Sequence, residues 1–223
     1  MPASTFAPLW LWMAFAGCLS ANLADRAFAA DGDDAPPAAQ APSPQAPPPQ
    51  ATHPLFSADG EVMIRLPENM TENLTLNAEA KIQAADLERE LYVLVISEPK
   101  RELPGGVTLA KYREAVLDNI GKSAKSIKLG ESEQFKLAGH NAVQSSFTAL
   151  APDIEPRISY LLTTVESDKA FHQILAWTLD SLAQRNMPVL KEVSASFQCD
   201  LRSARTADGR RQWSLPPGMT PSK

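Results

Sequence analysis

The sequence predicts an α+β domain in which helices flank an antiparallel β-sheet. Two observations support this class. Short apolar runs follow one another in hairpin order through the second half of the folded region, with turn residues between them. One amphipathic helix interrupts the strands, and a second helix follows the last of them.

The folded region is expected to start at Leu55 with a small hairpin. An Asp-Gly pair, which is a turn signal, precedes a strand expected over residues 61–66. Residues 74–82 alternate apolar and polar side chains, which predicts a strand with one buried face. Its expected partner, residues 91–96, is apolar on both faces, and such a strand needs cover on both sides of the sheet.

The clearest helix is expected over residues 109–120, where apolar positions follow helical spacing and Thr108 can cap the first turn. Pro188 is expected to begin the final helix, because proline suits the first helical turn. Between the two helices, turn residues separate four strands in meander order, expected over 127–135, 142–149, 157–166 and 170–178.

Composition divides the chain into four parts. Residues 1–29 are a leader whose apolar run is too short to span a bilayer but has the length of a signal-peptide core. Residues 30–54 are rich in proline and alanine, which predicts an extended linker. The α+β domain is expected over 55–197, followed by a basic tail over 198–223 that is expected to be disordered.

Two processing sites compete in the leader. Ala27 and Ala29 have the small side chains that signal peptidase requires, and cleavage there gives a periplasmic or secreted protein. Cys18, which follows a glycine, offers the alternative of a lipid-modified first residue that anchors the protein to the bacterial envelope. No Lys or Arg precedes Arg26, so the usual positive start of a signal peptide is missing. Simple cleavage is preferred, and the lipid anchor stays open as the expected route of any membrane contact.

Charge and cysteine content argue against two classes of protein. The net charge of −5 argues against a dedicated nucleic-acid binder. Of the 2 cysteines, Cys18 lies in the leader, so Cys199 has no intrachain partner and no disulfide framework is expected. We expect Cys199 to be a half-buried thiol at the end of the last helix.

No catalytic site, metal site or cofactor is predicted. The 3 histidines are His53, His140 and His172, and none of them stands in a metal-binding or nucleophile motif. We expect His172 to be a packed or surface histidine of the sheet. His140 would assist Ser145 or Ser146 only if the chain folded back on itself.

Two loops are the candidate binding sites, because connections on a rigid sheet often carry binding residues. The first loop contains Lys100 and Arg101, and the second contains Asp153, Glu155 and Arg157. Two carboxylates without further oxygen ligands make a weak calcium site, so the second loop is expected to be a solvated charged segment.

The order of several segments resembles the PsbP-like superfamily, in particular its bacterial branch around the DcrB lipoprotein. These segments are GEVMIRLPENM, VTLAKYREAVLDNI, KLAGHNAVQSSF, YLLTTVESDKAFHQILAWT and VLKEVSASF. Met70 stands about where the family often has Trp. The resemblance implies an α-β-α sandwich and a class of proteins that mostly bind other proteins or stabilise assemblies, without a common enzymatic site.

These observations predict an exported, non-catalytic protein of the cell envelope whose domain binds or stabilises a protein partner. A small hydrolase-like envelope enzyme is the alternative. Neither the partner nor the oligomeric state follows from the sequence.

Overall fold

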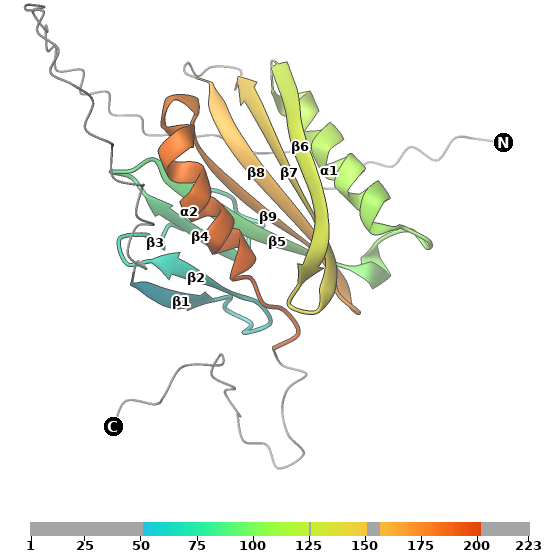
Figure 1. Cartoon of the computed structure of the whole chain (residues 1–223). Helices are drawn as coiled ribbons and strands as arrows, with labels where there is room; N and C mark the ends of the chain where they lie inside the picture. Colours follow the sequence, from blue (N-terminus) through green and yellow to red (C-terminus); the bar gives the residue numbers. More distant parts are fainter. Residues whose placement is uncertain (1–50, 125, 151–156, 202–223) are drawn as a thin grey trace, which may run out of the picture.

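A computed structural model describes residues 51–124, 126–150 and 157–201. It contains a seven-stranded antiparallel sheet in the order β3-β4-β5-β9-β8-β7-β6 and a separate hairpin of β1 and β2 (Figure 1). The strands are β1 (Thr52–Phe56), β2 (Met63–Pro67), β3 (Thr71–Glu72), β4 (Ile82–Asp86), β5 (Leu91–Pro99), β6 (Ser126–Leu137), β7 (His140–Leu150), β8 (Ile158–Glu166) and β9 (Ala170–Leu179). The helices are α1 (Leu109–Ser123) and α2 (Ala183–Ala195), and two short 3-10 helices are η1 (Lys100–Glu102) and η2 (Asp180–Leu182).

The two α-helices cover opposite faces of the sheet. α1 packs on β7 and β8, whereas α2 packs on β5, β8 and β9 and also contacts β2. One apolar cluster therefore lies between the sheet, α2 and the β1–β2 hairpin, and a second lies between the sheet and α1. This arrangement confirms the predicted α+β class and explains why β5 is apolar on both faces. Neither helix in the described part of the chain has the length and apolar character needed to cross a bilayer.

Helix α1 carries the chain from the centre of the sheet to its far edge. β5 is a central strand, and the strand that follows α1 is the edge strand β6. The meander of β6, β7, β8 and β9 then returns strand by strand until β9 pairs with β5. The prediction of a meander is therefore confirmed, and its last strand closes the sheet against a strand from the first half of the domain.

Local signals explain the start of α1. The side-chain oxygen of Thr108 accepts a hydrogen bond from the backbone amide of Lys111, as expected for a helix cap. Tyr112 and Val116, one turn apart, are the buried residues of the helix. The apolar stripe predicted from the sequence thus faces the sheet.

The predicted strand over 74–82 is wrong, because this segment forms turns and β4 begins only at its last residue. The side chain of Asn73 accepts a hydrogen bond from the amide of Thr75, and the side chain of Gln83 accepts from two further amides of the segment. These side-chain acceptors satisfy backbone groups that a strand would pair in a ladder. Leu74, which should have been buried, is 70% exposed.

The prediction that Pro188 begins the last helix is also wrong, because α2 begins at Ala183 and contains Pro188 on its exposed side. The first turns are held by Asn186, which is buried and whose side-chain amide donates to the backbone oxygen of Arg89 and the hydroxyl of Thr178, both at 2.8 Å. This tertiary anchor starts the helix upstream of the local proline signal.

Described backbone pairing also involves residues on either side of the range 55–197. β1 starts at Thr52, three residues before the expected start at Leu55, because the backbone of β2 pairs with it. After α2, Gln198 and Met63 exchange backbone hydrogen bonds at 2.9 Å. The segment after α2 is therefore tied to the hairpin.

Candidate functional site

A pocket of about 210 Å³ lies where β5 ends and β9 begins. These two strands are paired neighbours, and Ser97 on β5 is directly opposite His172 on β9. Both residues line the pocket. The charged residues around them come from five other segments and are Glu61, Lys81, Arg101, Lys169 and Asp200.

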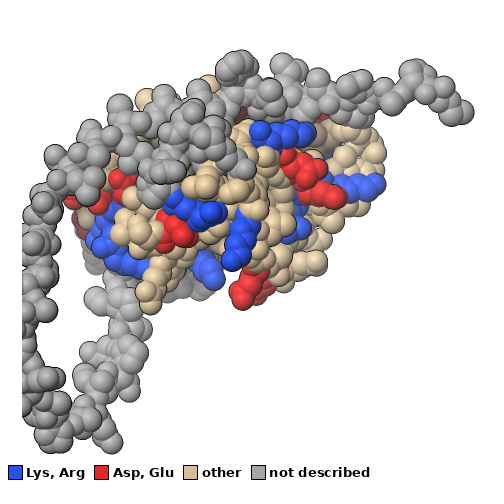
Figure 2. Space-filling model, turned by 90° about the horizontal axis from the view of Figure 1, so that it is seen from above, with Lys and Arg blue, Asp and Glu red and all other residues tan. Residues whose placement is uncertain are grey.

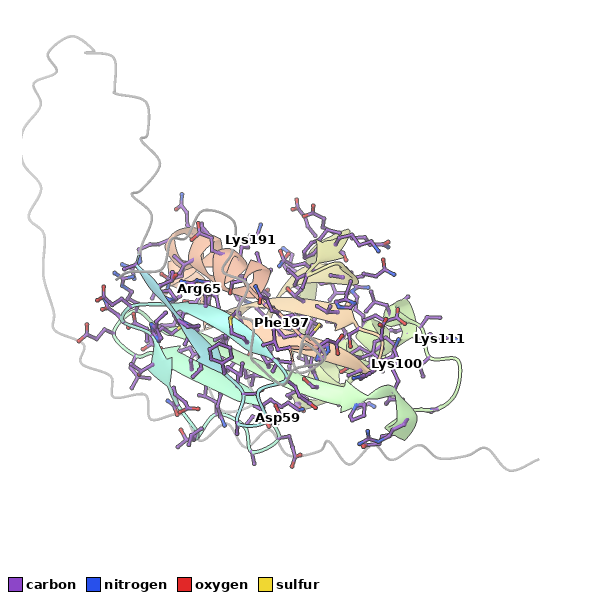
Figure 3. All side chains as sticks on the ribbon, turned by 90° about the horizontal axis from the view of Figure 1, so that it is seen from below. Asp59, Arg65, Lys100, Lys111, Lys191 and Phe197 are labelled. Carbon is purple, nitrogen blue, oxygen red and sulfur yellow. The ribbon has the colours of Figure 1, made fainter. Side chains whose placement is uncertain are left out.

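His172 forms the buried floor of this pocket. Its Nδ1 lies 2.8 Å from the hydroxyl oxygen of Ser97, and its Nε2 lies 3.2 Å from that of Ser167. The ring of Phe197, which lies between α2 and the sheet (Figure 3), packs 5.3 Å from the imidazole. Burial, followed by neighbouring positive charge, lowers the pKa of His172 to about 4. The imidazole is therefore neutral at pH 7, and the interpretation of His172 as a packed sheet histidine is confirmed.

An ion cluster connects the β1–β2 hairpin to the pocket wall. The ammonium of Lys81 lies 2.6 Å from a carboxylate oxygen of Asp59 and 2.7 Å from one of Glu61. Partial burial alone would raise the pKa of Asp59, but hydrogen bonds from Lys81, Ser57 and a backbone amide outweigh it and hold that pKa well below its usual range. The cluster fixes the hairpin turn, where Asp59 lies (Figure 3), against the start of β4.

The first predicted loop contributes to this site through one of its two residues. Lys100 donates to the carboxylate of Glu166 at 2.9 Å and lies 5.1 Å from the centre of the Phe171 ring, so its ammonium is held in place. The side chain of Arg101 lines the pocket and is 80% exposed, with its guanidinium 3.0 Å from the carboxylate of the adjacent Glu102. Arg101 is therefore the cation of this loop that a partner can reach.

Of the second predicted loop, only Arg157 belongs to the described residues. Asp153 and Glu155 lie outside the described residues. Arg157 lines a different, open groove of about 790 Å³, which β6, β7 and Met187 of α2 also border. Across the face seen in Figure 2, Lys and Arg are interspersed with Asp and Glu, and no broad basic surface gathers there.

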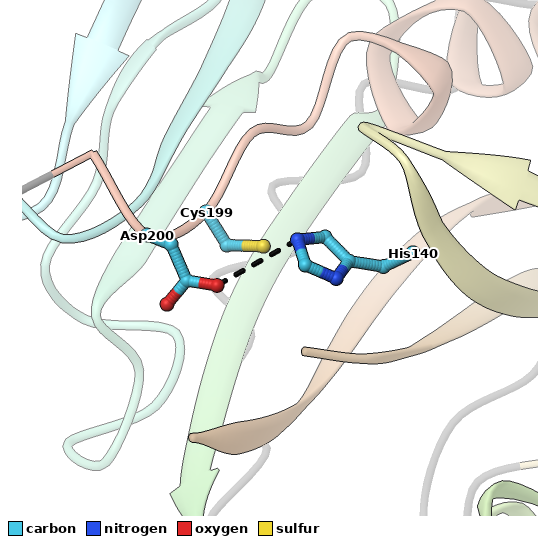
Figure 4. A group of neighbouring side chains, drawn as sticks. All are labelled: His140, Cys199 and Asp200. Carbon is cyan, nitrogen blue, oxygen red and sulfur yellow. Dashed lines mark ion pairs between the residues drawn. The ribbon is translucent and has the colours of Figure 1, made fainter. Parts of the chain in front are cut away.

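A third group, which the sequence does not predict, lies beside the pocket. Figure 4 shows His140, Cys199 and Asp200 pointing toward one another, and one donor atom from each lies within 4.8 Å of the other two. The Nε2 of His140 is 3.6 Å from a carboxylate oxygen of Asp200. His140 begins β7, whereas the other two residues follow α2. Because the three residues are far apart in the sequence, no local motif predicts that they meet.

The thiol of Cys199 is half-buried, as predicted. Burial, followed by the negative charges of Asp200 and Asp168, raises its pKa to about 12. A thiol with this pKa is protonated and a poor nucleophile at neutral pH.

His140 is not paired with the serines considered from the sequence. The hydroxyl of Ser145 accepts a hydrogen bond from Arg113, and that of Ser146 accepts one from the backbone amide of Glu131. The imidazole of His140 points instead toward the segment that follows α2 (Figure 4).

The contact between Ser97 and His172 has the spacing of a nucleophile and its base, but its surroundings fit that role poorly. A histidine with a pKa of about 4 is a weak base at neutral pH. Its other nitrogen faces the hydroxyl of Ser167, where a catalytic triad places a carboxylate. The arrangement is better suited to fixing the pocket floor than to activating a hydroxyl.

Comparisons with solved structures identify the fold. The solution structure of the cyanobacterial PsbP protein CyanoP from Synechocystis sp. PCC 6803 matches with a TM-score of 0.50 and 12% identity, over 70% of this chain and 97% of that chain. The Ran-binding protein Mog1p from Saccharomyces cerevisiae matches with a TM-score of 0.49 and 10% identity, over 68% and 96%. LpqN, involved in cell envelope biogenesis of Mycobacterium tuberculosis, matches with a TM-score of 0.47 and 16% identity, over 67% and 91%.

The domain therefore has the PsbP-like fold, and the predicted resemblance is confirmed at the level of the fold. No protein-family model and no curated protein matches the sequence. The assignment to the DcrB branch stays a prediction.

Proposed function

We propose that this chain is an exported, non-catalytic protein of the bacterial cell envelope whose PsbP-like domain binds a protein partner at the charged pocket. The observation that carries the proposal is the composition of that pocket. Five charged side chains of both signs surround a floor whose polar atoms already bond one another. Such a surface supplies electrostatic complementarity to a specific partner without a reactive group.

The size of the pocket supports a macromolecular partner. Small-molecule sites typically occupy about 300–1,000 Å³, whereas this pocket holds about 210 Å³. It can take one side chain from the surface of another protein, with Arg101 at its rim. Arginine is among the residues that most often dominate binding energy at protein interfaces.

Export is the second part of the proposal. We assign residues 1–29 to the signal peptide and the proline-rich residues that follow to a spacer, as their composition predicts. Cleavage after Ala29 gives a periplasmic or secreted protein, whereas lipidation of Cys18 tethers the same domain to a membrane. The proposed binding surface is the same in both forms.

Site-specific photocrosslinking tests the binding surface. The full-length protein, at native abundance in its own host, carries a photoreactive phenylalanine analogue at Arg101, and a control protein carries it at Lys122. Lys122 is exposed near the end of α1, where the chain enters β6, far from the turn that joins β6 to β7 at His140. We expect discrete protein adducts from position 101 only. Absence of adducts there, or the same adducts from both positions, contradicts the proposal.

The contact between Ser97 and His172 favours a hydrolase-like enzyme as the second candidate function. A fluorophosphonate probe, which reacts with activated serine hydroxyls, tests it on the full-length protein. Labelling that disappears in Ser97→Ala and His172→Gln would replace the binding proposal with the enzymatic one. If the probe does not label the protein, the hydrolase-like function is contradicted.

A further inference from the structure

Two distant segments bring three different metal-binding side chains to one place. His140 is held by the tight β6–β7 turn, in which Ala138 and Gly139 have φ of 50° and 86°. Cys199 and Asp200 follow α2, where Gln198 is hydrogen-bonded to Met63 of β2. The sheet edge and the segment after α2 therefore fix the donor atoms from opposite sides of the group (Figure 4).

The donor set selects the kind of ion. A thiolate and an imidazole are preferred by zinc and other late transition metals, whereas Ca²⁺ and Mg²⁺ prefer sites made of oxygen ligands. Zinc sites combine Cys, His and Asp ligands, and a site with three protein ligands leaves the fourth tetrahedral position to water. Cys199, His140 and Asp200 supply one ligand of each type.

The geometry lies close to that of a bound site. Ligand atoms about 2.0–2.3 Å from a tetrahedral zinc ion are roughly 3.3–3.7 Å from one another. The Nε2 of His140 and the carboxylate oxygen of Asp200 are already 3.6 Å apart. All three donor atoms lie within 4.8 Å, so a closure of about 1 Å completes the set.

The local charge also favours a cation. The carboxylates of Asp168 and Asp200 both act on the Cys199 thiol. The nearby ammonium of Lys81 is paired with the carboxylates of Asp59 and Glu61, so its single positive charge is more than offset by their two negative charges. The carboxylate of Asp200 is itself one of the three donors, so part of this negative charge lies where the cation would bind.

We propose that His140, Cys199 and Asp200 form a zinc site with one coordination position open to water. Zinc binds the thiolate of Cys199 and displaces its proton to the solvent, while the Nε2 of His140 and the carboxylate of Asp200 bind through lone pairs. The ion joins the start of β7 to the segment after α2. It therefore fastens the last described segment of the chain to the sheet, beside the pocket that Asp200 also lines.

Metal titration of the full-length protein tests this site. The purified, metal-stripped chain is titrated with Zn²⁺ against a chromophoric chelator, and with Co²⁺ while the thiolate-to-cobalt charge-transfer absorption is recorded. The variants are Cys199→Ser, His140→Asn and Asp200→Asn. Their matched controls are Cys18→Ser, His53→Asn and Asp118→Asn, which change the same residue types outside the group.

We expect one zinc per chain, with affinity reduced at least about tenfold in each of the three variants, since even the loss of an outer-shell partner has an effect of that size. The charge-transfer band should vanish in Cys199→Ser and persist in Cys18→Ser. The controls should bind zinc as the unaltered chain does. Circular dichroism of the metal-free variants shows whether each variant is still folded, so that the loss of a metal ligand can be told apart from unfolding. Zinc affinity that is unchanged by the three substitutions, or equally reduced by the controls, overturns the proposal.

Discussion

Because His172 is buried, the domain should lose stability as the pH falls through the mildly acidic range. In the folded state its pKa is lowered from 6.5 to about 4, first by burial and then by neighbouring positive charge. As the pH falls below 6.5, His172 therefore becomes protonated in the unfolded chain but stays neutral in the folded domain. The free energy of unfolding decreases as a result. The loss begins near the unfolded pKa and is complete once the pH falls below the folded pKa.

The size of this loss follows from the two pKa values. Between pH 7 and pH 4.5, the linkage relation gives about 2.5 kcal/mol lost from the free energy of unfolding. The substitution His172→Gln keeps a polar side chain but removes the titrating ring. Whatever this variant loses at pH 7, it should lose about 2.5 kcal/mol less than the unaltered protein between the two pH values.

Urea unfolding at both pH values, followed by circular dichroism, measures the difference. Carboxylates such as Asp59 titrate in both proteins, so their effect cancels when the two losses are subtracted. Equal losses in the two proteins, within about 0.5 kcal/mol, would refute the assignment of His172 as a neutral, buried residue.

Two further predictions concern packing, and both are checked by urea unfolding at pH 7. Gly130→Ala should destabilise the domain by about 1–3 kcal/mol, because the added Cβ would lie 2.6 Å from the hydroxyl oxygen of Ser146. The control is Gly105→Ala, whose Cβ would have no atom within 4 Å. This control should change the free energy of unfolding by less than about 0.5 kcal/mol. Asn186→Ala should lower the free energy of unfolding by about 1–3 kcal/mol, because it removes a buried donor from two acceptors. Gln184→Ala, on the exposed side of α2, is the control and should be nearly neutral. Equal effects of the two substitutions would contradict the role of Asn186 as the anchor of α2.

The parts of the fold that the sequence predicts are those where local pattern and tertiary burial agree. The continuous apolar run of β5, the capped stripe of α1 and the turn residues of the meander each carry their own signal. Residues 74–81 show where the agreement ends. Their alternation imitates a strand, but the side chains of Asn73 and Gln83 bind backbone amides that a strand would need.

The candidate site was harder to predict because its members are far apart in the chain. The composition of its loop predicts Arg101 as a binding residue, and Arg101 lines the pocket. Ser97 carries no signal of its own, since it meets His172 only through the pairing of β5 with β9. His140 and Asp200 are brought together by the meander and by the position of α2, so only the tertiary fold reveals their contact.

The pairing of β5 with β9 has a consequence for how the chain reaches its folded state. β5 is synthesised in the first half of the domain, yet its neighbour β9 and the helix α2 that covers both are the last described strand and α-helix to appear. A process that delivers the chain from its N-terminus, such as synthesis or passage through a translocation channel, therefore holds an incomplete sheet until the final strand arrives. The face of β5 that α2 covers stays exposed for that time. Closure of the sheet is thus postponed until these elements arrive. In the proposed export, this delay would keep the domain unfolded during threading, and the same interval is the one in which it most needs protection from aggregation.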